Sequence, residues 1–336
     1  LLLVFFPYVI PPYRVFLPKG NVQKAFITEN DLQPLPIQTL WGVCSEIERT
    51  LMNRFGKLGG LGKVYLDPKL DQYTVPFSQR SASKTLQTIS RGSTIHFADN
   101  NFRFFISWKQ SKGIRTDIDL SAVFFDGVWN NIGYVSYTSL RNQYAVHSGD
   151  ITSAPNGASE YIDLDVNEAI SDGVRYVMTQ VFCYTSTPFC DLPECSFGWM
   201  ERDDLNSGEI YECKTVKNEF DLSANSMLAL PVIIDLVQHK VIWCDISLKN
   251  HIGRTRPNRW GINVGGNNVE SNIDTITAMG LAMTNLEKTT IFDLLELHCF
   301  ARAEEIVNDP EEADTIFSED KGTHYQLDVL MNEFLT

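Results

Sequence analysis

The sequence predicts an α+β protein in which an antiparallel β-sandwich core lies between a mixed α/β N-terminal module and a helical C-terminal module. Between residues 101 and 250, short segments rich in Val, Ile, Phe and Tyr follow one another, which is typical of strands. Turn residues separate them at intervals that suit a sandwich better than alternating βαβ units. On both sides of this region, apolar residues recur at three- and four-residue steps, which indicates helices.

Residues 1–100 form the predicted N-terminal module. Apolar residues between 37 and 55 share one helical face, and a glycine-rich string follows at 56–63. This string does not match a phosphate-binding loop, because Gly56 and Gly62 enclose five residues and Val64 stands where a magnesium-binding hydroxyl is required. We therefore expect a helix that ends at these glycines.

Residues 101–250 form the predicted sandwich, and residues 251–272, rich in Gly, Asn and Arg, indicate a linker. The expected strands are NFRFFISW, DIDLSAVFFD, IGYVSYTSL, EYIDLDV, RYVMTQVFCYT, GEIYECKTV, LALPVIIDL and KVIWCDISL.

Residues 273–336 form the predicted helical module. Apolar residues from Ile273 to Leu286 mark one helical face, and Thr290 with Asp293 is a capping-box signal before a helix over 292–303. Asp309, followed by a proline and two glutamates, predicts a further helix start.

Composition narrows the partners and the compartment. The chain has 336 residues, of which 28 are basic and 42 acidic, for a net charge of -14. This balance repels phosphate backbones, so we expect no nucleic acid partner, and it favours cations or basic protein surfaces. The apolar stretch at residues 1–10 is shorter than the ~20 residues of a spanning helix. We expect a cytoplasmic protein without membrane insertion, and the seven scattered cysteines fit free thiols.

Two acidic residues at the start of a predicted strand suggest a cation site. Strand alternation places Asp117 and Asp119 on one face, with Ile118 on the other. Two carboxylates this close repel one another unless a cation or protonation relieves them.

The loop in AVHSGDITSAPNGASEYIDLD, residues 145–165, adds further oxygen ligands. Its side chains include Asp150, Asn156 and Glu160, and Gly149 frees backbone carbonyls for coordination. Calcium takes six to eight oxygens of these kinds. Composition alone still favours the simpler interpretation, a hydrated loop at the edge of a sandwich.

The same loop does not predict catalysis. Residues 147–150 contain His, Ser and Asp, but triad members meet through the fold and are seldom consecutive, and no GxSxG elbow is present. Spacing does not support an enzyme site built from His96, Arg91 and Glu46 either. We expect no enzymatic activity.

Seven segments, taken in order, resemble the TerD domain of tellurium-resistance and stress proteins. They are Trp108, DIDLSAVFFD (117–126), YVSYTSL (134–140), VHSGDITSAPNGASEYIDLDV (146–166), VRYVMTQVFCYT (174–185), FGWMERDDLNSGEIYE (197–212) and VIWCDISL (241–248). The match covers roughly residues 105–250. Flanking motifs, among them RVFLPKGN (14–21) and LLELHCFARA (294–303), resemble a larger bacterial cytoplasmic subgroup with modules added on both sides of this core.

This resemblance implies a sandwich that binds calcium in loops at one end and acts with other proteins in stress-response complexes, not as an enzyme. Asp117 and Asp119 match the acids of the DLD strand of the family, and Glu160 matches the final acid of its loop. Gly149 and Asp150 match its GDN turn.

Departures from the family pattern predict weaker calcium binding. Ile151 stands where the family has Asn, and three further ligand-type positions have changed, to Pro155, Ala158 and Ser159. Fewer charged ligands lower calcium affinity, so we expect one weak site in preference to two strong ones. Two functions stay open: a calcium-binding interaction module, and a metal-independent protein-assembly module whose calcium site has degenerated.

Overall fold

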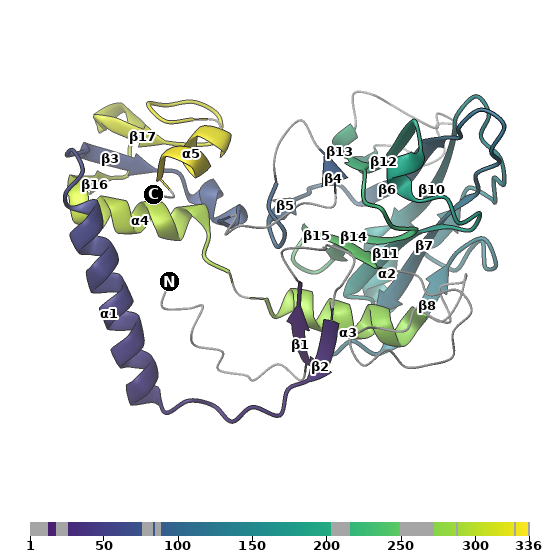
Figure 1. Cartoon of the computed structure of the whole chain (residues 1–336), viewed down its shortest axis with the longest axis horizontal. Coiled ribbons are helices and arrows are strands. Elements are labelled where there is room, and N and C mark those ends of the chain that lie inside the picture. The colour runs from purple at the N-terminus through teal and green to yellow at the C-terminus, as the bar shows by residue number, and fades with distance from the viewer. Residues whose placement is uncertain are drawn as a thin grey trace.

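The computed structural model describes residues 13–17, 26–75, 83–84, 89–202, 216–248, 272–286, 288–325 and 327–334. Two six-stranded sheets form a sandwich, and a smaller group of helices and strands, here called the second lobe, lies beside it (Figure 1). The predicted α+β class with an antiparallel sandwich core is confirmed.

The two sheets of the sandwich are antiparallel throughout. The first sheet has the order β4-β13-β12-β6-β10-β9, and the second has the order β5-β15-β14-β11-β7-β8. Their bounds are β4 Ser83–Lys84, β5 Thr94–His96, β6 Asn101–Lys109, β7 Ile118–Phe125, β8 Asn131–Val135, β9 Ala145–His147, β10 Ala158–Asp165, β11 Tyr176–Cys183, β12 Glu194–Glu201, β13 Val216–Leu222, β14 Leu228–Asp235 and β15 Lys240–Leu248.

Seven of the eight predicted strands correspond to strands of the sandwich. The eighth, GEIYECKTV, lies outside the described residues except for Val216, where β13 begins. The structure adds β12, whose sequence ECSFGWME contains no β-branched residue and therefore gives only a weak strand signal.

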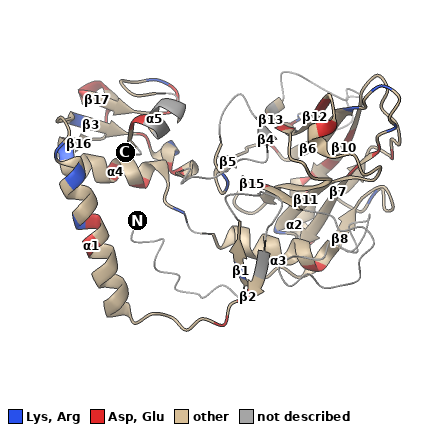
Figure 2. Ribbon diagram, in the orientation of Figure 1, with Lys and Arg blue, Asp and Glu red and all other residues tan. Residues whose placement is uncertain are grey.

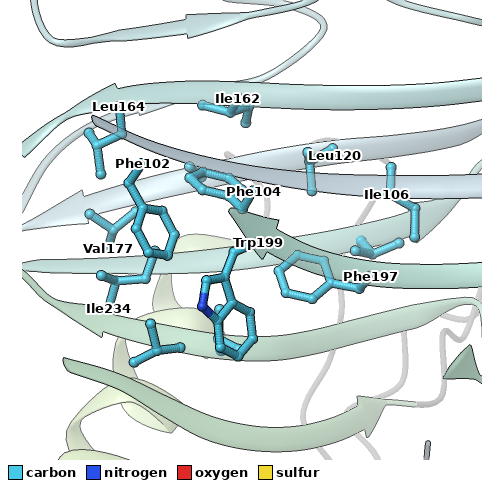
Figure 3. Packing of buried hydrophobic residues seen from close by; sticks show 14 of the residues in the cluster. Phe102, Phe104, Ile106, Leu120, Ile162, Leu164, Val177, Phe197, Trp199 and Ile234 are labelled. Carbon is cyan, nitrogen blue, oxygen red and sulfur yellow. The ribbon is translucent and has the colours of Figure 1, made fainter. Parts of the chain in front are cut away.

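Alternating side chains of both sheets fill the space between them. Phe104 of β6 and Trp199 of β12 face Leu120 of β7 and Ile234 of β14 across this core (Figure 3). Each of these four side chains is almost fully buried. Burial of each large apolar side chain contributes about 1.5–3 kcal/mol, so this core fixes the relative position of the two sheets.

The outer face of the second sheet is also buried, because a helix and a hairpin cover it. Helix α3 (Ile273–Thr284) packs there with Ile276 and Met279, and strands β1 (Tyr13–Phe16) and β2 (Phe26–Glu29) pair beside it. Strand β7 therefore has two buried faces, with Phe124 toward the sandwich core and Phe125 toward α3. At its other end, the outer face of β7 carries Asp119.

The second lobe combines residues from both ends of the chain. It contains α1 (Ile37–Phe55), β3 (Gly62–Leu66), α4 (Ile291–Arg302), β16 (Ala303–Val307), β17 (Thr315–Phe317) and α5 (Leu327–Phe334). Short 3₁₀ helices lie at Pro68–Gln72 and Pro310–Glu312 in this lobe, and another lies at Phe189–Asp191 in the sandwich. β3 is central and pairs in parallel with both β16 and β17. α1 ends at Phe55, directly before the glycine-rich string, as predicted.

The structure differs from the predicted division into separate N- and C-terminal modules. β3, from the predicted first module, shares a sheet with two strands of the predicted helical module, while β4, β5 and α3 join the sandwich. The reason is that parallel pairing joins segments far apart in sequence, and local periodicity does not report such contacts. The capping box of α4 is confirmed. The start signal at Asp309 opens only the 3₁₀ helix Pro310–Glu312.

The predicted linker lies outside the described residues except for Asn272, which directly precedes α3. Among the helices of the described ranges, none combines the length and the apolar character needed to cross a membrane.

Candidate cation site

Three carboxylates converge at one end of the sandwich. Asp117 and Asp119 lie at the start of β7, and Asp150 lies in the loop between β9 and β10. One oxygen from each of the three lies within 4.8 Å of the others. Residues 184–185 hold the backbone of Asp117 in place, since the Thr185 hydroxyl accepts from its N–H at 3.2 Å and the Tyr184 N–H donates to its carbonyl at 3.0 Å.

The two strand acids are buried and incompletely hydrogen-bonded. Asp117 and Asp119 are each 5% exposed. Within the described part of the chain, Asp117 Oδ1 and Asp119 Oδ2 have no hydrogen-bond partner. A buried acceptor without a donor costs ~1–3 kcal/mol, and a charged one costs more. Asp150 is exposed, so the cluster reaches solvent through the loop.

Burial and mutual repulsion both disfavour the charged forms of these acids. Burial raises the pKa of Asp119 to about 8, with Asp117, Glu160 and Asp150 adding to the effect. Burial and then Asp150 raise the pKa of Asp117, and the neighbouring Arg115 opposes them. The acids also affect Tyr137: burial is the larger cause that raises the pKa of its hydroxyl, and the charge of Asp119 adds to it. A bound cation would reverse this balance for the acids.

Arg115 is a basic side chain in direct contact with the cluster. Its Nη2 donates to Asp117 Oδ2 at 3.3 Å, and its Nε donates to the carbonyl of Thr152 at 2.7 Å. The guanidinium therefore connects the strand to the loop and leaves the second oxygen of Asp117 without a partner. The Arg115 side chain is 60% exposed, so solvent screens much of its charge.

Glu160 lies beside the three acids but is already hydrogen-bonded. Its Oε1 accepts from the N–H of Ile151 at 2.9 Å, and its Oε2 accepts from the N–H of Leu120 at 3.0 Å. His147 Nε2 lies 3.5 Å from Glu160 Oε2, and neither side chain is exposed. Glu160 is absent from the group of three whose oxygens converge.

The remaining candidate residues lie in the same loop. Gly149 has a φ of 112°, a left-handed conformation that favours glycine, and its N–H donates to His147 Nδ1 at 3.0 Å. Asn156 is exposed, in a turn next to Pro155. Coordination by Gly149, Asn156 or Glu160 stays a prediction.

Sequence reasoning missed three side chains at the site: Arg115, Tyr137 and His147 in its hydrogen-bonding role. Arg115 lies only two residues before Asp117, so a basic residue next to an acidic pair was the available signal. Tyr137 follows β8 and comes near the acids only through the fold, which local sequence does not show. The role of His147 depends on contacts with a different sheet.

Fold and site together define a class: an antiparallel β-sandwich with a partly buried acidic cluster at one end. Among solved structures, a homologue of the telluride resistance protein TerD from Streptomyces coelicolor A3(2) is similar over 46% of this chain and 94% of its own, with 10% identity and a TM-score of 0.38. A protein of unknown function, SAV2460, is similar over 45% of this chain and 93% of its own, with 16% identity and a TM-score of 0.35. No protein-family model matches the chain, and no curated protein matches its sequence.

Proposed function

We propose that this chain binds one calcium ion at Asp117, Asp119 and Asp150 and acts as a non-enzymatic, TerD-like interaction module. Its setting would be a bacterial stress or tellurite-resistance-type system in the cytoplasm, with other proteins of a stress-response complex as partners. The observation that carries the calcium proposal is the convergence of two buried carboxylates, each with an unpartnered oxygen, on a third acid. The order of TerD-like motifs in the sequence supports the wider role.

The donor atoms fit a hard cation. All three converging side chains offer carboxylate oxygens, which calcium prefers, whereas zinc and copper favour nitrogen and sulfur. Both ring nitrogens of the nearby His147 already take part in hydrogen bonds. The three converging oxygens, one from each carboxylate, are fewer than the six to eight that calcium requires, so water or loop carbonyls must complete the shell, and the affinity should be modest.

One observation favours a second function, a metal-independent assembly module. The guanidinium of Arg115 already provides a positive charge 3.3 Å from Asp117. In a degenerated site, this arginine would take over part of the cation's role and hold the loop against the strand. Partner proteins would then bind regardless of calcium.

Calorimetry with calcium separates the two functions. The first function predicts binding heat in the unmodified chain, its loss in Asp119→Asn, and its retention in the matched control Glu168→Gln, an exposed acid on α2 (Val166–Ser171). A melting temperature that rises with millimolar calcium and falls back with chelator would agree, because a ligand stabilises the state it binds. No heat and no thermal shift would favour the metal-independent module.

A further inference from the structure

The side chains of His147 and Glu160 cross from the first sheet to the open edge of β7 in the second. β8 pairs with β7 only from Ala122 onward, so none of the described strands neighbours the edge of β7 at Leu120 on that side. His147 Nε2 contacts the carbonyl of Leu120 at 3.0 Å, and the N–H of Leu120 donates to Glu160 at 3.0 Å. Two side chains thus satisfy the backbone groups that a further strand would have paired.

The same two side chains also hold the acidic loop. The second oxygen of Glu160 accepts from the N–H of Ile151, and His147 Nδ1 accepts from the N–H of Gly149. Each side chain therefore has one contact with β7 and one with the loop. The backbone groups they hold flank the acids closely: Leu120 follows Asp119, while residues 149 and 151 lie on either side of Asp150.

The hydrogen-bond directions assign the histidine tautomer. A backbone N–H can only donate, so His147 Nδ1 accepts from Gly149, and the proton lies on Nε2, which donates to Leu120 O. The ring is neutral in this arrangement. Both side chains are fully buried, and a fully satisfied buried network holds its members in one geometry.

We propose that His147 and Glu160 are positioning residues that set calcium affinity by fixing Asp150 against Asp119, and that neither is a ligand. This inference rests on the cation site proposed above. Replacement of residues that hold metal ligands in place without contacting the metal typically lowers metal affinity by about 10- to 100-fold. We expect His147→Ala and Glu160→Gln to weaken binding by factors in that range.

Terbium(III), which takes calcium sites and emits when nearby tyrosines are excited, is the probe. Titration gives the dissociation constant, and emission lifetimes in H₂O and D₂O count the water molecules on the bound ion. Asp150→Ala serves as the reference for a lost ligand and should add coordinated water. His147→Ala and Glu160→Gln should weaken binding without adding water. His96→Ala and Glu168→Gln, at exposed positions on β5 and α2, are the matched controls.

Circular dichroism at the titration temperature checks that each variant is folded. If the alanine variant unfolds, His147→Gln takes its place, because the amide nitrogen of glutamine can donate to Leu120 O, whereas its amide oxygen does not occupy the position of Nδ1 next to Gly149. Unchanged dissociation constants in the His147 and Glu160 variants would overturn the inference and leave the cation site intact. Added water in Glu160→Gln would identify Glu160 as a ligand and overturn its positioning role. Absence of terbium binding in the unmodified chain would overturn both the site and the inference.

Discussion

Arg115 places a positively charged side chain next to the acidic cluster, and we expect its removal to strengthen the proposed calcium binding. The guanidinium contacts Asp117, so it would compete with the proposed calcium ion for that carboxylate and would repel the ion. Exposed ion pairs are worth ~0.2–1 kcal/mol, so Arg115→Gln should tighten calcium binding by about 1.4- to five-fold. Calorimetry at two salt concentrations measures the change, which should shrink at high salt. Lys112→Gln, at an exposed position in the preceding loop, is the control.

An equal or lower affinity in Arg115→Gln would contradict this prediction. It would show that the contact of Arg115 with the carbonyl of Thr152, which ties the loop to the strand, matters more than charge repulsion.

His298 gives the second lobe a defined dependence on pH. Burial lowers its pKa to about 4, against the hydrogen bond with the Phe334 carbonyl, which favours the charged ring. The unfolded chain takes up a proton near pH 6.5 that the folded lobe refuses. The stability contributed by the neutral ring is therefore present above pH 6.5 and is lost as the pH falls toward 4. His298→Gln should be less stable at pH 7 and should lose less stability on acidification.

Thermal melting of the unmodified chain and of His298→Gln between pH 7 and pH 4.5 measures this difference in stability. Parallel pH profiles for the two proteins would contradict the assignment, because glutamine does not titrate.

The acids of the candidate site could be located from the sequence, but the side chains around them could not. Strand alternation was enough to place Asp117 and Asp119 on one face, and loop composition pointed to Asp150. The hydrogen bonds of Glu160 with Leu120 and Ile151 connect two sheets and a loop. Such contacts form only when the sheets pack together, so no local sequence pattern predicts them.

Helix α3 depends on a glycine at its contact with the sandwich. A Cβ at Gly280 would lie 1.9 Å from the ring of Trp129, which itself stacks on Tyr176. Gly280→Ala must therefore displace the helix or the ring, and overpacking of this kind costs about 1–3 kcal/mol. Denaturant unfolding measures the loss. Gly42→Ala, which has open space around it in α1, should leave stability equal or slightly higher.

Equal stabilities of Gly280→Ala and the unmodified chain would show that α3 can shift on the sheet without cost. Intrinsic tryptophan fluorescence would report such a shift, since Trp129 lies at the contact.

The positions of individual helices and strands were better predicted than the pairing between strands. Apolar periodicity located α1, and the pair Thr290 and Asp293 located the start of α4, because both signals lie within a few residues. β16 and β17 were not predicted, because each is short and pairs with β3. The residues of the sandwich separate β3 from both strands in the sequence.

The sandwich and the second lobe should differ in how far their folding depends on residues 303–336. Truncation after residue 302 removes β16, β17 and α5, and with them both neighbours of β3. We expect the second lobe to unfold, while the sandwich keeps its strands and its acidic cluster. Limited proteolysis should then cleave within α1, and terbium binding should persist. Resistance of α1 to cleavage would show that α4 alone holds it.

The surface of the second lobe is uneven in charge. The first half of α1 contains no charged residue (Figure 2), and it exposes Ile37, Trp41 and Val43. The chain as a whole has a net charge of -14, to which this end of the helix contributes nothing.

The central position of β3 also has a consequence for biosynthesis. The Leu61 carbonyl next to β3 accepts from the hydroxyl of Thr315, 254 residues later. At ~5–20 residues per second, a ribosome needs roughly 10–50 s to cover that distance. During this interval α1 and β3 have emerged without their partners, whereas the strands of the sandwich that follow can already pair with one another. We therefore expect α1 and β3 to stay unpaired during this interval, which exposes them to aggregation until β16 and β17 have been synthesised.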